Sequence, residues 1–184
     1  MMKIAVYCSA KDRIPAEYLA LGDELGTRIA TMGHSLVYGG ATGGLMTRVS
    51  NAAKLSGAAV IGVVPLRIIV ANRLADNCDT LYVVSSMSER KQKMRELSDC
   101  FVCLPGSYGT MDEMMDVVAS GTVGEHDKPI IVLNYKGFYE GLKLQEQKMR
   151  ELSFLPMVCS CSPVFVDTMD ELINALEILT NNKK

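Results

Sequence analysis

Residues 86–116, SMSERKQKMRELSDCFVCLPGSYGTMDEMMD, decide the fold of this chain. They predict a polar helix, a short buried strand over residues 100–104, a glycine turn, and a second helix that begins near Thr110. Gly106 and Gly109 allow the backbone to turn tightly between the strand and the second helix. Exposed backbone N–H groups at a helix N-terminus attract an anion, typically a phosphate. The stretch therefore predicts a phosphate cradle at a strand-to-helix turn.

Charged side chains flank this cradle on both sides. Glu113 falls in the first turn of the second helix, and Arg90 and Lys91 begin the polar helix. A carboxylate and two cations beside a phosphate cradle indicate chemistry on a phosphorylated small molecule. Plainer interpretations also stand. Thr110 with Glu113 fits the T-x-x-E capping box, and the two cations alone fit a solvated helix face.

The rest of the chain alternates apolar strands with helices. Residues 66–79 show no clear period, so we interpret them as a loop with one helical turn that forms a lid or a substrate wall. The predicted strands are 3–8, 35–38, 59–64, 80–84, 100–104, 129–134 and 164–166. The predicted helices are 15–31, 45–55, 86–98, the one from 110, 137–152 and 168–179, with a frayed tail after them.

Strands that are apolar throughout and alternate with helices predict an α/β fold. In such folds a parallel sheet is covered by helices on both faces, and ligands bind at the carboxyl ends of the strands. We therefore predict a Rossmann-like, doubly wound parallel sheet. A length of 184 residues fits a single domain over residues 1–184.

A second glycine turn, GGATGG, follows the strand that ends at Tyr38. Its glycines are Gly39, Gly40, Gly43 and Gly44. The turn lacks both the G-x-G-x-x-G dinucleotide fingerprint and the G-K-[ST] of a Walker A loop. Two interpretations stay open, a tight strand-to-helix turn or a close approach of the backbone to a nucleotide.

Composition excludes several classes of partner. The net charge of -2 argues against a nucleic-acid surface, because backbone binding needs clustered cations. No apolar run approaches the ~18 residues of a membrane span. Lys3 is followed at once by the strand pattern IAVYC, which is not a secretory leader. We expect a cytoplasmic protein without nucleic-acid or membrane partners.

The sequence contains six cysteines, and we expect them to be reduced. Cys100 and Cys103 form a C-x-x-C, but three-residue spacing on a strand points the two thiols to opposite faces, which favours packing over a redox or zinc role. Cys159 and Cys161 have no second ligand pair nearby in sequence. His34 and His126 stand apart from any nucleophile pattern. We also expect no metal site.

Taken together, the motifs VYCSA, LVYGGATGGLM, MSERKQKM and LPGSYGTMDE resemble the lonely-guy family over nearly the whole chain. Members of that family are cytokinin riboside 5′-monophosphate phosphoribohydrolases, often labelled lysine decarboxylases. The resemblance implies hydrolysis of the N-glycosidic bond of a nucleoside 5′-monophosphate, with AMP or an N6-modified AMP as substrate. It implies no cofactor, and it implies a homodimer or larger homo-oligomer with the site near the subunit interface.

The resemblance also implies roles for individual residues. Arg90 and Glu113 match the catalytic pair, in which the carboxylate stabilises a cationic sugar and the guanidinium holds that carboxylate ionised. The implied substrate-binding residues are Met87, Lys91, Gly106, Ser107, Tyr108, Gly109, Thr110, Gly39, Gly40, Gly43 and Gly44.

Three segments depart from the family pattern. Ser88 replaces a histidine, Ser107 replaces a glycine, and residues 119–124 lack a tryptophan and a glutamine. The departures at Ser88 and Ser107 favour a second hypothesis, a non-catalytic nucleotide-binding or carrier protein of the same fold. A third hypothesis is an enzyme that acts on a different phosphosugar through the same cradle. The sequence leaves open the preferred base, the oligomer size and the biological pathway.

Overall fold

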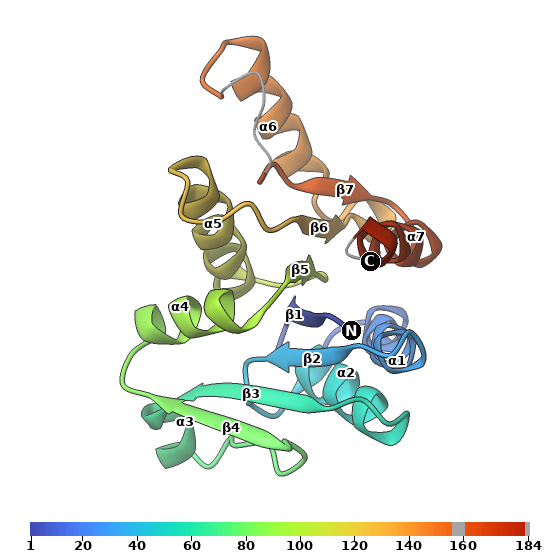
Figure 1. The fold of residues 1–184 in the computed structure, drawn as a ribbon, viewed down its shortest axis with the longest axis vertical. Helices are drawn as coiled ribbons and strands as arrows, with labels where there is room; N and C mark the ends of the chain where they lie inside the picture. Colours follow the sequence, from blue (N-terminus) through green and yellow to red (C-terminus); the bar gives the residue numbers. More distant parts are fainter. Residues whose placement is uncertain (156–160, 183–184) are drawn as a thin grey trace.

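The computed structural model describes residues 1–155 and 161–182, and in this part of the chain seven strands form one sheet (Figure 1). All paired strands are parallel, and their order is β4-β3-β2-β1-β5-β6-β7. The strands are β1 (Lys3–Tyr7), β2 (Ser35–Tyr38), β3 (Val60–Pro65), β4 (Thr80–Val84), β5 (Cys100–Cys103), β6 (Ile130–Leu133) and β7 (Val164–Val166).

Helices cover both faces of the sheet and bury two apolar clusters. One cluster packs β1 and β2 against α1, α2 and α7, and the other packs the opposite face against α4 and α5. The helices are α1 (Ala16–Thr31), α2 (Gly44–Leu55), α3 (Leu66–Val70), α4 (Met87–Leu97), α5 (Tyr108–Thr122), α6 (Glu140–Glu151) and α7 (Met169–Asn182), with a 3₁₀ turn, η1, at Tyr135–Gly137.

The predicted Rossmann-like, doubly wound parallel sheet is confirmed. The strand order reverses direction between β1 and β5, because β2, β3 and β4 extend to one side and β6 and β7 to the other. Ligands of such sheets bind in the crevice outside the carboxyl ends of the strands at this switch point. Both glycine turns, after β2 and after β5, lie at this edge.

Three predicted element boundaries were wrong. Helix α5 begins at Tyr108 with Ser107 in the cap position, so Thr110 lies inside the helix. The helix predicted over 137–152 begins later, at Glu140, because the 3₁₀ turn η1, in which Lys136 adopts a left-handed φ of 53°, ends at Gly137. Helix α7 continues to Asn182, where the sequence analysis placed a frayed tail.

The C-x-x-C prediction is confirmed. Cys100 packs in the cluster beneath α1, α2 and α7, whereas Cys103 packs in the cluster beneath α4 and α5. Cys159 lies outside the described residues. Among the described residues, no group of histidine, cysteine and acidic side chains is placed to hold a metal ion, and no helix is long and apolar enough to cross a membrane.

Two glycines that the sequence analysis did not single out bring α1 and α2 close together. A Cβ built at Gly26 would press on the carbonyl oxygen of Val49 and lie 2.8 Å from the backbone nitrogen of Ala53. A Cβ at Gly22 would lie 2.9 Å from the Cβ of Arg48. The backbones of the two helices therefore approach to a distance that only glycine permits, and this contact holds α2 in place behind the GGATGG turn.

We predict that Gly26→Ala lowers the free energy of unfolding by about 1–3 kcal/mol, because the new methyl group overpacks the contact between α1 and α2. Gly141→Ala in α6 is the matched control. A Cβ there meets no atom within 4 Å, so the change should raise helix stability by roughly 0.5–1 kcal/mol. Urea denaturation measures both, and equal effects of the two substitutions would contradict the close helix contact.

Candidate active site

A buried ion pair joins α4 to α5 at the carboxyl edge of the sheet. Arg90, in the first turn of α4, donates through Nη1 to Oε1 of Glu113, and the two residues are only 5% and 3% exposed. The guanidinium Nε also donates to the carbonyl of Val63 on β3, at 3.0 Å. Removing charges from water is costly unless they are paired and hydrogen-bonded, and this pair meets both conditions.

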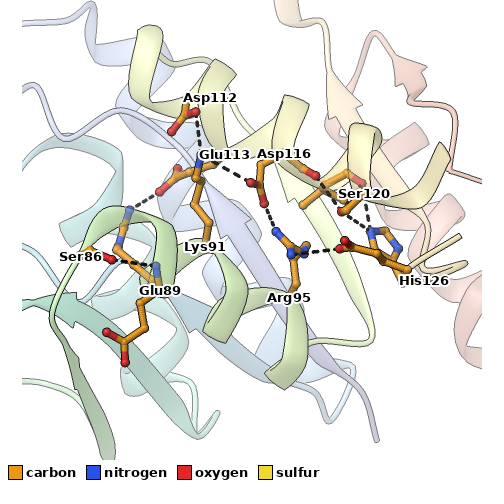
Figure 2. Close-up of polar contacts among 12 residues, drawn as sticks. Ser86, Glu89, Lys91, Arg95, Asp112, Glu113, Asp116, Ser120 and His126 are labelled. Atoms are coloured by element: carbon orange, nitrogen blue, oxygen red, sulfur yellow. Dashed lines mark hydrogen bonds and ion pairs between the residues drawn. The ribbon is translucent and has the colours of Figure 1, made fainter. Parts of the chain in front are cut away.

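Local sequence fixes the position of Arg90. The hydroxyl of Ser86 accepts a hydrogen bond from the amide of Glu89 at 3.1 Å and caps α4 (Figure 2). The guanidinium then passes over Gly39, where a built Cβ would collide with Nη2 of Arg90. Gly39 is therefore required to make room for the arginine at the end of β2.

The turn after β5 leaves amides open at the start of α5. No side chain caps this helix, because the hydroxyl of Ser107 makes no capping hydrogen bond. A Cβ at Gly106 would collide with the side chain of Thr110, so the turn needs glycine there. The first N–H groups of this 15-residue helix thus have no capping partner, as in an anion cradle.

Glu113 follows this cradle by one helical turn, and the structure excludes the capping box. A capping box places the glutamate at the third helical position, with its carboxylate on the cap residue. Glu113 is the sixth residue of α5, and its carboxylate bonds to Arg90. The plain structural interpretation of Glu113 was therefore wrong.

The ion pair and the cradle open into one cavity of about 260 Å³. Among the predicted site residues, the structure brings together at this cavity Gly39, Met87, Arg90, Ser107, Gly109, Thr110 and Glu113. The cavity is also lined by residues that the sequence analysis did not assign to the site, namely Cys8, Ser9, Ala10, Lys11, Ala41, Met46, Pro65, Arg67, Ile68 and Arg73. The motifs VYCSA and LVYGGATGGLM contain five of them (Cys8, Ser9, Ala10, Ala41 and Met46). For Arg67, Ile68 and Arg73 the signal was the irregular composition of residues 66–79, since a substrate wall was one interpretation of that segment.

The other glycine-turn residues do not line this cavity. The amide of Gly43 donates to Oγ1 of Thr47 at 2.7 Å, and that of Gly44 donates to Oδ1 of Asp12 at 2.8 Å. Protein groups therefore occupy the amides that were expected to approach a nucleotide. Gly40 has a φ of 64° and lies against β3, so its role is in the backbone turn. These contacts fit a tight strand-to-helix turn, and the approach of a nucleotide to GGATGG stays a prediction.

Three predicted binding residues also lie elsewhere. Tyr108 is 89% exposed, and Gly106 lines a neighbouring apolar depression rather than this cavity. Lys91 extends from α4 along α5, where its Nζ lies 2.8 Å from Oδ1 of Asp112 and 3.5 Å from Oδ1 of Asp116 (Figure 2). Lys91 thus pairs with acidic side chains of α5 and does not line this cavity, and its binding of a substrate stays a prediction.

A second layer of ion pairs supports the buried pair from behind. Arg95, one turn after Lys91 on α4, contacts Asp116 and also Glu125, the latter at 3.3 Å (Figure 2). Asp116 therefore receives cations from two positions of α4. This clamp, made of Lys91, Arg95, Asp112 and Asp116, sets the spacing between α4 and α5 and hence the alignment of Arg90 with Glu113.

Burial determines the electrostatics of the carboxyl. Desolvation raises the pKa of Glu113 above its ordinary value, and the Arg90 guanidinium acts in the opposite direction without cancelling it. Asp112 raises the same pKa further, whereas Lys91 lowers it. Burial and the Glu113 charge also raise the pKa of the Tyr7 hydroxyl and the Cys8 thiol beside it. The sequence analysis expected the Arg90 guanidinium to hold Glu113 ionised, but the effect of burial on the pKa outweighs that of the guanidinium.

The sequence matches a known protein family. The model of the family described as "Possible lysine decarboxylase" matches residues 46–176. A cytokinin riboside 5′-monophosphate phosphoribohydrolase of Mycobacterium marinum is 37% identical over 173 residues, 94% of this chain and 91% of that protein. An enzyme of the same name from Arabidopsis thaliana is 33% identical over 95% of this chain and 82% of its own length.

The chain belongs to this family. The resemblance to the lonely-guy family, drawn from the four motifs, is thereby confirmed. Solved structures share the fold of this lonely-guy family member at lower identity. The Moco carrier protein of Chlamydomonas superimposes with a TM-score of 0.71 at 22% identity, covering 98% of both chains. The molybdenum cofactor binding protein of Rippkaea orientalis gives 0.72 at 21% identity, covering 97% of both. At these identities the likeness concerns the fold alone.

We predict that the Glu113 carboxyl titrates above the usual range of about 4.2 for protein glutamates. Lys91→Met removes a nearby positive charge and should raise its pKa further. Asp112→Asn removes a nearby negative charge and should lower it. Carbon-detected NMR titration of labelled glutamate carboxyls measures all three. Lys93→Met, on the same helix but paired with Glu96, serves as a control that leaves the Glu113 titration unchanged. A lowered Glu113 pKa in Lys91→Met, or a raised one in Asp112→Asn, would contradict these interactions.

Proposed function

We propose that this lonely-guy family member hydrolyses the N-glycosidic bond of a nucleoside 5′-monophosphate to a free base and ribose 5-phosphate. AMP or an N6-modified AMP is the substrate that we propose. The curated relatives that match most of the chain carry the name of this activity. The single observation that carries the proposal is the buried Arg90–Glu113 pair, which opens into a cavity one helical turn from the uncapped amides of α5.

The 5′-phosphate is placed at the start of α5. The backbone amides after Ser107 and the hydroxyl of Thr110 bind its oxygens, and the helix dipole favours its negative charge. Anchoring the phosphate there fixes the ribose beside Glu113, since the two are separated by one turn of helix. The entropy of orienting the ribose is then lost when the substrate binds, so it no longer contributes to the activation barrier of the chemical step.

Glu113 acts on the sugar and on water. As the C1′–N bond lengthens, positive charge develops on the ribose, and the ionised carboxylate stabilises it. The same carboxylate accepts a proton from the water that attacks C1′. Arg90 keeps the carboxylate oriented through its hydrogen bond, while its second bond to Val63 fixes the guanidinium itself. Met46, Ile68 and Met87 provide the apolar lining for the base.

We predict that Glu113→Gln lowers kcat for release of adenine from AMP by at least about 100-fold, because the amide accepts no proton and carries no charge. Chromatography of AMP with purified protein measures base release. Glu17→Gln, which alters an exposed carboxylate paired with Lys136, is the control and should retain activity. Retained turnover in the Glu113 variant would refute its role. Tight AMP binding without any cleavage by the wild type would favour the carrier hypothesis.

The pH dependence follows from the raised pKa of Glu113. The reaction needs the ionised form, so kcat/KM should fall as the pH drops through that pKa, and the acid limb should lie above the ordinary glutamate range. Initial rates over a pH series check this. An acid limb at or below the ordinary range would show that Glu113 is not the titrating base.

The oligomeric state is part of the same proposal. We propose a homodimer or a larger homo-oligomer in the cytoplasm. Helix α6 projects beyond the sheet (Figure 1) and has no buried residue. A groove beside it is lined by Met115, Val118, Leu142 and Met149. Sedimentation velocity tests this proposal, and a monomer at micromolar concentration would contradict it.

A further inference from the structure

Two arginines stand at the end of the cavity that lies away from the phosphate cradle. Arg67 belongs to α3, directly after β3, and Arg73 lies beside the turn that follows β2. The cradle follows β5, on the other side of β1 in the sheet. With the phosphate at the cradle and the ribose beside Glu113, the base extends toward Arg67 and Arg73.

Neither arginine is compensated by an acidic side chain. The ion pairs of the described residues engage Arg48, Arg90, Arg95 and Arg150, but not Arg67 or Arg73. The backbone holds Arg73 in place, since its Nη2 donates to the carbonyl of Thr42 at 3.2 Å and the Thr42 amide donates to the Arg73 carbonyl at 2.8 Å. The base end of the cavity therefore carries two positive charges that have no ion-pair partner among the described residues.

Positive charge at the base end of the cavity would stabilise the leaving group of the proposed reaction. When the C1′–N bond breaks, its electron pair leaves with the base. Glycoside hydrolases commonly use two carboxyl groups, one of which protonates the leaving group. Among the described residues that line this cavity, Glu113 supplies the only carboxyl group, and its place is beside the sugar. The leaving base needs another means of stabilisation.

We propose that Arg67 and Arg73 are further catalytic residues that stabilise the negative charge on the departing base. This inference rests on the proposed function. Water oxygen bonds to C1′, its proton passes to Glu113, and the C1′–N electron pair leaves on the base against the two guanidinium groups. The departed base then takes one proton from solvent, and Glu113 releases the proton that it accepted back to solvent. Atoms and charge therefore balance without another reactant.

Substrates with different leaving groups test the assignment. The probes are AMP, whose adenine is a poor leaving group, and 4-nitrophenyl β-D-ribofuranoside 5-phosphate, whose nitrophenolate departs without assistance. In the double variant Arg67→Gln/Arg73→Gln, kcat with AMP should fall by at least about 10-fold. This loss is smaller than the loss of a hydrogen-bond donor fully enclosed by protein would cause, because both arginines are exposed. The kcat with the nitrophenyl substrate should change by less than about 3-fold.

Arg13→Gln is the matched control, because Arg13 is exposed and absent from the cavity lining, and it should leave both rates unchanged. Equal losses on both substrates would overturn the inference, since they would place the arginines on the common phosphate. Unchanged rates on both would overturn it as well. A wild type that cleaves neither substrate would instead refute the proposed function, and this inference with it.

Discussion

The buried ion pair between Arg90 and Glu113 is the constraint on which the site depends. Two charges with so little access to water persist only where each finds a partner, and the surrounding structure supplies those partners. Gly39 leaves room for the guanidinium, the carbonyl of Val63 accepts its second hydrogen bond, and α5 presents the carboxylate. Residues from β2, β3, α4 and α5 thus meet at one point, at the switch point of the sheet.

The consequences for chemistry follow from the same burial. A carboxyl with a raised pKa is a stronger base once ionised, and the clamp around Lys91 and Asp112 adjusts that pKa from outside the cavity. In the function that we propose, the phosphate cradle needs no charged side chain, because helix amides bind the anion. That proposal assigns an anion site to one end of the cavity, the carboxylate to its centre and the cations Arg67 and Arg73 to the other end.

The sequence predicted the layers of the fold well and the site in part. Apolar strands alternate with helices so regularly that β2, β4 and β7 were placed at their observed bounds. The T-x-x-E spacing wrongly predicted a capping box. Helix α5 begins directly after Ser107, so Glu113 lies beyond its first turn and its carboxylate pairs with Arg90. The sequence also did not predict the direction in which the side chain of Lys91 points. Lys91 follows Arg90 immediately, yet it turns about 100° around the helix and reaches Asp112 instead of the cavity. Arg67 and Arg73 carried no motif, since only the fold brings residues 66–79 to the cavity.

A crystal structure of Glu113→Gln with AMP bound tests the central claim most directly. The account predicts the 5′-phosphate on the amides that follow Ser107, with the anomeric carbon within roughly 4 Å of the residue 113 amide and the base toward Arg67, as a reactive alignment requires. A phosphate bound at the arginine end, or a ribose remote from residue 113, would contradict it.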